Sequence, residues 1–383
     1  MKICMAAAFD IKNKLSWSGT PLSLYSALSG YKTNDIETVN LSLYHNVFNT
    51  RINAIKNCDI KESIKNKCWV SKLGPSAMNP LNSKLLHKKC SKKDFDVLIE
   101  FGGFQPHKNL PPYYIYTDAT HDLKLDYFKK YGYLPFGSEK DSIESIKKAA
   151  ETVKRIYQNA DGVFCMSQWL ADSLVNTTGV PKEKVHVVYA GANWHNTILP
   201  ENISKKEIRG KEEIHLLLVG VEYKRKGIDI AIEAVKHLNS LNEKKYILHT
   251  CGVKDITSDD QYIINHSFVD KKKLIELLTA CDVFVLPTRF DCFGISFVEA
   301  MTFGLPCIGR NICAMPEIID EGVNGELITS DDPRQLAEKI QKICCDTEVF
   351  ESYSVAALEK AKMFTWEKVA ENMMRIIEED RKK

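Results

Sequence analysis

Short apolar runs alternate with longer amphipathic stretches along the whole chain of 383 residues. The apolar runs are rich in β-branched and aromatic side chains and often end in Gly, Ser, Thr or Asp, which is typical of strands that a parallel sheet buries on both faces. The longer stretches place apolar side chains at helical spacing. This alternation predicts an α/β protein in which helices cover mostly parallel sheets.

The predicted strands fall into two groups. They span residues 2–9, 36–43, 96–103, 113–118, 162–167 and 185–191 in the first group, and 214–220, 245–252, 283–288 and 306–310 in the second. The polar residues 196–213 between the groups show no regular spacing, as expected of a linker. Because one hydrophobic core usually stops growing at about 250 to 300 residues, we predict two domains, 1–200 and 201–365. A final amphipathic helix, 366–383, either closes the second domain or returns to the first.

Composition narrows the class of protein. The 52 Lys and Arg nearly balance the 50 Asp and Glu, which disfavours a dedicated nucleic-acid-binding protein. The 12 cysteines form no C-x-x-C pair, as expected of buried thiols in a reducing compartment. No apolar run reaches the roughly 18 residues that a membrane-spanning helix needs, and the amino terminus turns acidic too soon for a signal peptide. We therefore expect a cytoplasmic protein.

Positive charge is concentrated in residues 51–93, where eleven Lys and Arg stand against two acids. Apolar side chains, including Trp69 and Val70, are interleaved with them. One interpretation is peripheral contact with an anionic membrane at its inner face, where each well-placed basic residue contributes about 1 kcal/mol. A solvated excursion of the chain is the equal alternative. Nucleic acid is the weakest candidate, because aromatic stacking platforms are missing.

A strand-to-helix turn in the second group carries two acids. The sequence RFDCFGISFVEA (289–300) places Asp291 before Gly294 and Glu299 inside the helix that follows. Ligands of parallel sheets collect beyond the carboxyl ends of strands, and a glycine at a helix start lets a phosphate approach the backbone. The structural alternative is a capping box, because Ser296 and Glu299 have its spacing.

A basic loop follows the first strand of the same group. The sequence VGVEYKRKG (219–227) places Lys224, Arg225 and Lys226 before Gly227, which opens an amphipathic helix. Cations beside a helix start would neutralise a diphosphate, although a basic loop alone is also ordinary solvated surface. Together, the basic loop and the acidic turn indicate an anion site at one edge of one sheet.

The run from Gly220 to Leu327 resembles family 4 of the retaining glycosyltransferases, which have the GT-B fold. The resemblance rests on the ordered motifs VGVEYKRKG, ACDVFVLPTRFDCFGISFVEAMTFGLPCIG, MPEII and GVNGELI. It implies two Rossmann-like α/β domains facing a central cleft. It also implies a metal-independent enzyme without a prosthetic group, which transfers a hexosyl unit with retention. The donor would be a nucleotide-diphospho-sugar, UDP- or GDP-hexose, and the acceptor a glycan, a lipid-linked glycan or a small molecule.

The same resemblance implies roles for residues of the second domain. Asp291 and Glu299 keep the family's spacing of two acids, so Asp291 would bind donor-sugar hydroxyls and Glu299 the nucleotide ribose. Lys226, with Arg225 beside it, would hold the diphosphate. The other implied donor-binding residues are Phe293, Gly294 and Ile295 near the diphosphate and Ser267 and Phe268 near the base.

Two positions depart from the family pattern. The first acid is usually Glu, and Asp291 is shorter by one C–C bond, about 1.5 Å of reach, so the bound sugar or its tilt is expected to differ. The residue after the strand-closing glycine is commonly Arg and is Val221 here. Arg225 is the candidate that replaces this charge.

A glycine-bearing turn follows the first strand of the chain. Thr20 or Ser18 is suited to an N-cap, Pro21 to the first helical turn, and Gly19 to close approach of the backbone to a ligand. An ordinary capped turn is the alternative. The resemblance implies that Gly19 contacts the donor phosphate or the acceptor, with Ser18 and Thr20 on the acceptor side.

Strand 113–118 ends in a second candidate cluster. The family often has His at the strand end that Asp118 occupies, where it contacts the donor sugar, so Asp118 is a catalytic candidate together with Asp291 and Lys226. His121 is an acceptor-side candidate, with a surface position in a polar loop as the alternative. Ser167, at a later strand end, is a further acceptor-side candidate.

Other chemistries find less support. Asp94 and Asp96 have the spacing of an acidic pair that binds a divalent cation in a different transferase fold, but they precede their strand. We therefore assign no metal site. No G-x-G-x-x-G and no P-loop follows a strand. The alternatives to a transferase are a non-catalytic sugar-nucleotide-binding protein and a phosphorylase or epimerase of the same fold.

Overall fold

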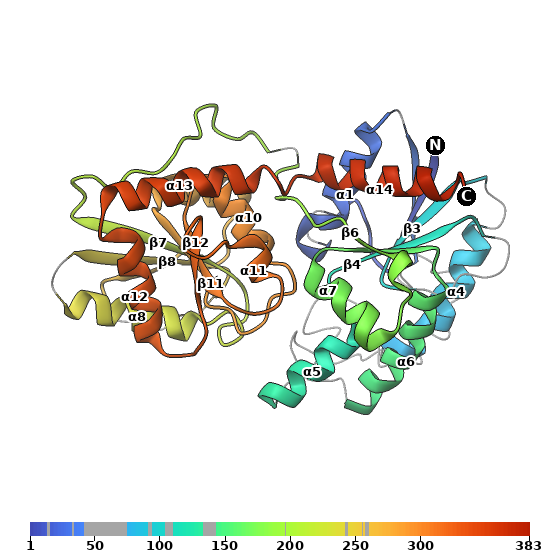
Figure 1. The fold of residues 1–383 in the computed structure, drawn as a ribbon, viewed down its shortest axis with the longest axis horizontal. Helices are drawn as coiled ribbons and strands as arrows, with labels where there is room; N and C mark the ends of the chain where they lie inside the picture. Colours follow the sequence, from blue (N-terminus) through green and yellow to red (C-terminus); the bar gives the residue numbers. More distant parts are fainter. Residues whose placement is uncertain are drawn as a thin grey trace. The chain divides into compact units, whose positions relative to one another are not determined.

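The computed structural model describes residues 1–13, 16–32, 34–41, 75–90, 94–103, 110–132, 143–195, 197–241, 244–254, 256 and 260–383. The chain divides into two compact units: unit 1 comprises Met1–Tyr189 and Val369–Lys383, and unit 2 comprises Ala190–Lys368. Each unit is a parallel sheet flanked by helices (Figure 1). This is the α/β class that the alternating pattern predicted.

Unit 1 contains a sheet with the strand order β2-β1-β3-β4-β5-β6. Its strands are β1 (Lys2–Ala7), β2 (Asp35–Asn40), β3 (Val97–Phe101), β4 (Tyr113–Thr117), β5 (Gly162–Cys165) and β6 (Val185–Val187). Its helices are α1 (Thr20–Gly30), α4 (Pro75–Cys90), α5 (His121–Tyr131), α6 (Ile143–Asn159), α7 (Gln168–Ser173) and, from Val369 onward, α14 (Trp366–Asp380). Its short helical turns are η1 (Ser16–Gly19), η2 (Leu174–Thr178) and η3 (Lys182–Lys184). The strand order reverses between β1 and β3, and ligands bind at such switch points.

Unit 2 has the strand order β12-β11-β10-β7-β8-β9. Its strands are β7 (Glu213–Val219), β8 (Lys245–Cys251), β9 (Ile263–Asn265), β10 (Val283–Val285), β11 (Cys307–Arg310) and β12 (Gly325–Ile328). Its helices are α8 (Ile228–Ser240), α9 (Lys271–Ala280), α10 (Ile295–Met301), α11 (Met315–Ile318), α12 (Pro333–Cys344) and α13 (Thr347–Ala361). Read from β9, this is the strand order of a Rossmann sheet, with its switch point between β7 and β10.

Burial explains why the central strands are continuous apolar runs. β3, β4 and β5 are buried at every position, because helices cover both faces of a parallel sheet. Glu100 is the polar exception in β3, and it accepts a hydrogen bond from the Tyr113 hydroxyl at 2.6 Å. The edge strands β9 and β12 were not predicted, because three or four residues are too short to show a period.

Helix starts follow local chemistry in several places but not at the predicted caps. Asp270 caps α9 by accepting from the Lys273 amide, as expected because Asp is a preferred N-cap residue. The N-cap of α1 is Gly19, at φ 85°, so the prediction that Ser18 or Thr20 occupies it is wrong. The capping-box alternative is also wrong, because α10 begins after Gly294 and Ser296 lies within its first turn.

The division between the units falls at Tyr189, before the boundary expected near residue 200. The segment that follows packs within unit 2. A Cβ at Gly191 would lie 2.5 Å from the backbone nitrogen of Trp366, and the Trp366 indole donates to Asn193 at 3.0 Å. Trp194 packs edge-on against Phe303. Tertiary contacts therefore assign to unit 2 a segment that resembles a strand end in sequence.

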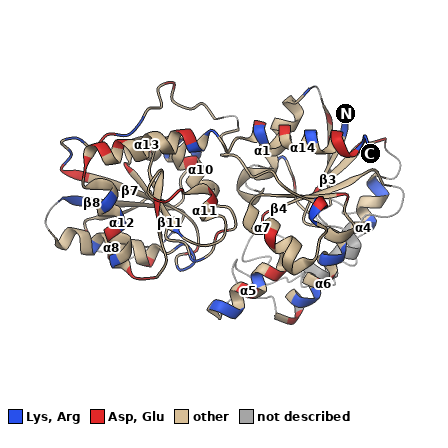
Figure 2. Cartoon of the chain, in the orientation of Figure 1, with Lys and Arg blue, Asp and Glu red and all other residues tan. Residues whose placement is uncertain are grey.

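The basic segment 51–93 lies largely outside the described residues. Its described part is α4, which carries Lys84, Lys88 and Lys89 (Figure 2). Lys89 donates to the carbonyl of Asn40 at 3.0 Å. Over the ranges that the structure describes, no helix combines the length and the apolar character that crossing a membrane requires.

Candidate active site

Two loops of unit 2 are tied together at the switch point between β7 and β10. The backbone amide of Arg289 and the hydroxyl of Thr288 both donate to the carbonyl of Arg225, at 2.7 and 3.1 Å. In return, the Arg225 guanidinium donates to the carbonyl of Phe290 at 2.9 Å. We call this arrangement of residues 224–227 and 288–291 the loop clasp. Its reciprocal bonds fix the two loops as one surface.

The loop clasp brings Lys226 and Asp291 into an ion pair. The distance from Lys226 Nζ to Asp291 Oδ2 is 2.5 Å, and the two side chains are 10% and 17% exposed. The Lys226 side chain crosses the end of β7, where a Cβ at Gly220 would lie 2.8 Å from its Cγ. A ligand that brings a phosphate to Lys226 and a hydroxyl to Asp291 would satisfy both groups.

Arg225 and Arg289 each donate a hydrogen bond to a backbone carbonyl of the opposite loop. Arg225 is 7% exposed, and its second nitrogen donates to Glu222 at 2.9 Å. Arg289 donates to Asp229 at 3.0 and 3.1 Å and to Asp331 at 2.8 Å. Burial opposes the charge of Arg289, but hydrogen bonds to these two carboxylates outweigh it and raise its pKa. Arg225 therefore serves the loops in this structure, and its role toward a diphosphate stays a prediction.

Glu299 stands inside α10 and is paired with a lysine from α9. Lys271 Nζ donates to Glu299 Oε1 at 2.8 Å and lies 4.6 Å from the centre of the Trp194 ring. Phe293, before the helix, is buried and packs edge-on against Phe364. Glu299 is thus a largely buried carboxylate paired with the Lys271 ammonium, not a helix cap.

The predicted base-binding turn follows β9. Ser267 has a left-handed backbone, φ 55°, which is uncommon for a residue with a side chain. Its carbonyl accepts from the Gly252 amide at 2.7 Å, and its hydroxyl donates to the carbonyl of Lys254 at 3.2 Å. The next residue, Phe268, is 69% exposed. The turn therefore presents an aromatic ring beside the carboxyl ends of β8 and β9.

In unit 1 the loop after β1 is bound to the end of β4. Trp17, Ser18 and Gly19 have φ values of 46°, 56° and 85°, three consecutive left-handed residues. The Trp17 ring packs edge-on against Phe101, and its indole nitrogen donates to Asp118 at 3.3 Å. The structure therefore brings the predicted Gly19 and Asp118 segments together at the switch point of unit 1.

The other two acceptor-side candidates, His121 and Ser167, lie at helix starts. His121 is the first residue of α5, and burial, with Lys124 nearby, lowers its pKa to about 4. His121 is partly buried at a helix start rather than in a loop. Ser167 is fully buried and caps α7 by accepting from the Leu170 amide at 3.1 Å. Its hydroxyl is not exposed to an acceptor.

Comparison with known proteins adds the family. Residues 200–360 match the family model described as Glycosyl transferases group 1. This segment belongs to that family. An uncharacterized 41.2 kDa protein from the cps region of Klebsiella pneumoniae is 28% identical over 231 residues, 57% of this chain and 63% of that protein. An uncharacterized glycosyltransferase of Methanocaldococcus jannaschii is 26% identical over 251 residues, 63% of this chain and 66% of that protein.

Both relatives are matched over less than two thirds of their own lengths. Solved structures are similar over nearly the whole chain. Sucrose-phosphate synthase from Thermosynechococcus elongatus has a TM-score of 0.71 at 15% identity and covers 99% of this chain and 98% of its own. WaaG, a glycosyltransferase involved in lipopolysaccharide biosynthesis, has a TM-score of 0.65 at 14% identity, covering 98% and 99%. These likenesses show the fold, which is GT-B.

Three residues around the candidate sites were missed by sequence reasoning. Lys271 lies 28 positions before its partner Glu299, and Arg289 reaches Asp229 across 60 positions. Trp17 lies 101 positions from Asp118. No local spacing connects such pairs. The only available signal was that Arg289 and Trp17 stand in loops that follow strands.

Asp94 and Asp96 stand at the amino end of β3, opposite the ligand edge. Asp96 accepts from the Lys2 amide at 2.7 Å and from Arg381 at 2.9 Å, and Asp94 pairs with Lys2 at 3.5 Å. Within the described ranges, no group of three or more His, Cys, Asp or Glu is placed to hold a metal ion.

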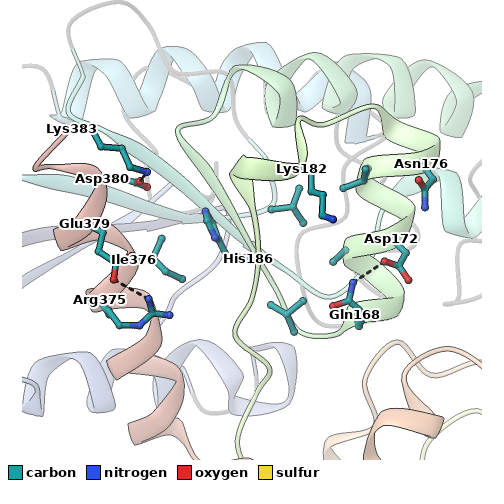
Figure 3. Close-up of a pocket in the computed structure, with 14 residues that line it drawn as sticks. Gln168, Asp172, Asn176, Lys182, His186, Arg375, Ile376, Glu379, Asp380 and Lys383 are labelled. Carbon is teal, nitrogen blue, oxygen red and sulfur yellow. Dashed lines mark hydrogen bonds and ion pairs between the residues drawn. The ribbon is translucent and has the colours of Figure 1, made fainter.

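A cavity of about 670 Å³ lies in unit 1 beside β6, between α7 and α14 (Figure 3). Gln168 donates to Asp172 at 2.7 Å on one wall, and Arg375 donates to Glu379 at 3.0 Å on the other. None of the predicted site residues lines it. Its walls are charged, but their charges are largely paired with one another.

Proposed function

We propose that the protein is a retaining glycosyltransferase that takes its sugar from a nucleotide-diphospho-sugar. The observation that carries this proposal is the Lys226–Asp291 pair, which stands at the switch point between β7 and β10 inside the group 1 segment. Ligands of open parallel sheets bind at this point. A cation and a carboxylate in contact there suit a ligand that joins a diphosphate to a sugar.

Each predicted residue then has a place around one donor molecule. Lys226 would bind the diphosphate, Asp291 the sugar hydroxyls and Glu299 the ribose. The Ser267–Phe268 turn would receive the base, because an exposed aromatic ring stacks on a flat heterocycle. A structurally similar Anabaena protein, TM-score 0.60, was solved in complex with UDP and glucose, which supports UDP-hexose as the first donor to test. A mannosyltransferase relative from Escherichia coli keeps GDP-hexose in the screen.

The mechanism follows from where charge develops. As the bond between the anomeric carbon and the diphosphate oxygen breaks, negative charge grows on the leaving phosphate, and Lys226 stabilises it. Removing one preorganised donor of this kind typically costs about 3 kcal/mol of transition-state stabilisation. A front-face route suits these residues: the acceptor oxygen bonds to the anomeric carbon, and its proton passes to the leaving phosphate. This route retains the anomeric configuration without a carboxylate nucleophile or a metal ion.

The acceptor would be a glycan, free or lipid-linked. Two comparisons support this class: the lipopolysaccharide role printed for WaaG and the serotype-specific role of the mannosyltransferase relative. Contact of segment 51–93 with an anionic membrane would bring a lipid-linked acceptor to unit 1. Binding of the protein to vesicles with and without anionic lipid tests that part separately.

A thermal-shift screen against UDP, GDP, ADP and their common hexose conjugates tests the donor. Ligand binding stabilises the native state by about 2.7 kcal/mol at a hundredfold excess over Kd. We expect a selective rise in Tm with one base and one sugar, followed by transfer to an acceptor glycan. The absence of a shift with every nucleotide would overturn the donor site.

A non-catalytic sugar-nucleotide-binding protein is the second candidate. The departures at Asp291 and at Val221, which is 46% exposed where the family commonly has Arg, favour it. This candidate predicts donor binding without consumption. An epimerase of the same fold would instead convert donor without any acceptor, so donor, nucleoside diphosphate and sugar products are measured together.

A further inference from the structure

Three histidines form a continuous hydrogen-bonded row across the neighbouring strands β7, β8 and β9 of the unit 2 sheet. His215 of β7 contacts His249 of β8 between Nδ1 and Nε2 at 2.9 Å, and His249 contacts His266, just after β9, between Nδ1 and Nε2 at 2.9 Å. The ring centres are 5.2 Å apart in both pairs. We call these three residues the histidine ladder. None of them has a role in the site described above.

The two ends of the histidine ladder face opposite charges. At the β7 end, His215 Nε2 lies 3.9 Å from Glu213, whose other oxygen pairs with Lys245 at 3.3 Å. The backbone amide of His215 donates to Asp282, which is paired with Lys211. The Glu213 carboxylate therefore lies beside the His215 ring, and the Asp282 carboxylate binds the His215 backbone.

At the other end, α9 supplies a cation. Lys273 faces His249 and His266, and it also donates to Glu276 at 3.1 Å. Burial, together with the rings of His215 and His266, lowers the pKa of His249 to about 4. Burial and Lys273 also lower the pKa of His266. His249 and His266 are consequently neutral at neutral pH.

The two N···N contacts limit how many protons the histidine ladder can bind. Each N···N contact needs one N–H and one lone pair. Three neutral imidazoles carry three protons, so two fill the contacts and the third sits on one terminal nitrogen. One extra proton fills the other terminal nitrogen and leaves both contacts intact. A second extra proton would place two N–H groups face to face and break a contact.

The charges at the ends set the direction of proton movement. In the neutral ladder, Glu213 favours the terminal proton on His215 Nε2, so His249 donates to His215, His266 donates to His249, and His266 Nδ1 keeps a lone pair. When His266 Nδ1 takes a proton, its Nε2 proton passes to His249 Nδ1 and the His249 Nε2 proton passes to His215 Nδ1. Both contacts keep one N–H and one lone pair throughout, so the extra proton is shared along the row.

We propose that the histidine ladder is a one-proton relay that couples pH to the Ser267–Phe268 turn. His266 directly precedes this turn, and proton uptake converts its Nδ1 from an acceptor into a donor. The turn is strained at Ser267 and is held by the Gly252 amide, so a reversed hydrogen-bonding group beside it shifts its position. For nucleotide affinity, the proposal rests on the proposed function, which places the base at this turn.

Nitrogen-detected NMR of the full-length chain, labelled at its 10 histidines, tests the relay without any nucleotide. Between pH 7.5 and 3.5 we expect the three rings to titrate with one common midpoint and one proton, because coupled groups titrate as a unit. In an amide-labelled sample, Ser267 and Phe268 should move at the same midpoint. Three independent ring midpoints would overturn the relay. Amide signals of Ser267 and Phe268 that stay constant while the rings titrate would also overturn it.

Two variants separate the relay from plain packing. His249→Phe keeps the ring volume but removes both contacts, and it should abolish the shared midpoint at Ser267 and Phe268. His215→Phe cuts only the first contact and keeps the proposal testable if His249→Phe does not fold. Its midpoint should fall to lower pH, because the extra proton is then shared by two rings instead of three. An unchanged midpoint in the folded variant contradicts the relay.

Nucleotide affinity gives the functional readout, with UDP, GDP and ADP as probes. We expect the wild-type Kd of the nucleotide that binds to rise about twofold from pH 7.5 to 4.0, because at a pKa of about 4 for His249 the unprotonated, binding-competent fraction falls to about half. This dependence should flatten in His249→Phe. His237→Phe, on α8 outside the ladder, should keep the wild-type profile. Equal profiles for wild type and His249→Phe would overturn the coupling to nucleotide. If no nucleotide binds at pH 7.5, the proposed function fails, and the NMR titration still decides the relay.

Discussion

Lys226 and Asp291 show how single residues of the candidate site depend on one another. Each is nearly buried, and each satisfies the charge of the other across two loops. A buried ion pair is costly to break by removing one partner, because the remaining charge keeps its desolvation penalty. Substitutions at either position are therefore expected to affect both the local structure and the binding of a ligand.

Lys226→Ala should weaken nucleoside diphosphate binding by about 2 kcal/mol, or roughly 30-fold in Kd, because a charge-assisted hydrogen bond to phosphate is lost. Isothermal titration calorimetry with the nucleotide selected by thermal shift measures it. Lys236→Ala, at an exposed lysine of α8, is the control. Wild-type affinity in a folded Lys226→Ala protein would remove Lys226 from the site.

Gly227 has a backbone that only glycine fits. Its φ is 70°, and a Cβ there would lie 2.3 Å from the carbonyl oxygen of Pro287. Gly227→Ala should destabilise the protein by more than about 2 kcal/mol, since a backbone atom cannot yield as a flexible side chain does. Gly322→Ala is the matched control, with φ 80° but open space around the Cβ. Equal urea midpoints for the two variants would show that the contact with Pro287 is unimportant.

His121 makes stability depend on pH. Its pKa is lowered to about 4 by burial, whereas an unfolded His has a pKa near 6.5. As pH falls below about 6.5, the unfolded state takes up the proton first, so this contribution to stability is lost between about pH 6.5 and 4. Urea unfolding at pH 7 and 5 should show a smaller loss for His121→Gln than for wild type. A loss of the same size in His237→Gln and His121→Gln would exclude this origin.

At the scale of elements, the geometry at Lys226 and Asp291 depends more on the loop clasp than on α10, the helix that follows it. α10 has seven residues and no side-chain cap, and so its own stability is small. The loops before α8 and α10 are instead joined by backbone and side-chain bonds through Arg225 and Arg289. Geometry at Lys226 and Asp291 is therefore set by contacts between elements.

Arg289→Gln tests this dependence. Arg289 is 13% exposed and pairs with Asp229 and Asp331, so its removal leaves Asp229 without a main partner and should cost about 3 kcal/mol of stability. Nucleotide affinity should fall with it, because Arg289 also binds the carbonyl of Lys224. Arg375→Gln removes an exposed pair and is expected to cost under about 1 kcal/mol. Similar denaturation midpoints for both variants would contradict a structural clasp.

At the scale of the whole molecule, the chain returns to unit 1 through its last residues. The Tyr114 hydroxyl donates to Asp380 at 3.0 Å, and Arg381 donates to Asp96 at 2.9 Å. The buried side chains of α14 in unit 1 are Val369, Ala370, Met373, Met374, Ile376 and Ile377. Unit 1 is therefore completed by a segment that follows unit 2 in sequence.

Deletion of Val369–Lys383 should destabilise unit 1 selectively, because the deletion exposes the apolar surface that α14 covers. Calorimetry should show the transition of unit 1 shifted to lower temperature, with the transition of unit 2 unchanged. Deletion of only Arg381–Lys383, which are exposed, should leave both transitions nearly in place. A single transition that moves as a whole in the long deletion would contradict this assignment.

The sequence by itself determined the α/β class, ten strands and the loops that carry the candidate site. Buried parallel strands and amphipathic helices differ in the spacing of apolar residues over a few positions, so local pattern was enough. The motifs around Lys226, Asp291 and Glu299 carried the resemblance to the family.

Only the tertiary structure decided the order of the strands, and with it the switch point between β7 and β10. Strand order, the Lys271–Glu299 pair, the loop clasp and the histidine ladder all join residues far apart in the chain, and no local spacing encodes such contacts. The predicted caps at Ser18, Thr20 and Ser296 were wrong because glycines with left-handed backbones begin α1 and α10. At Gly294 the folded chain also brings side chains close, since a Cβ would lie 2.6 Å from Met315 Cε and 2.9 Å from Phe297 Cδ2, contacts that form only when the chain has folded.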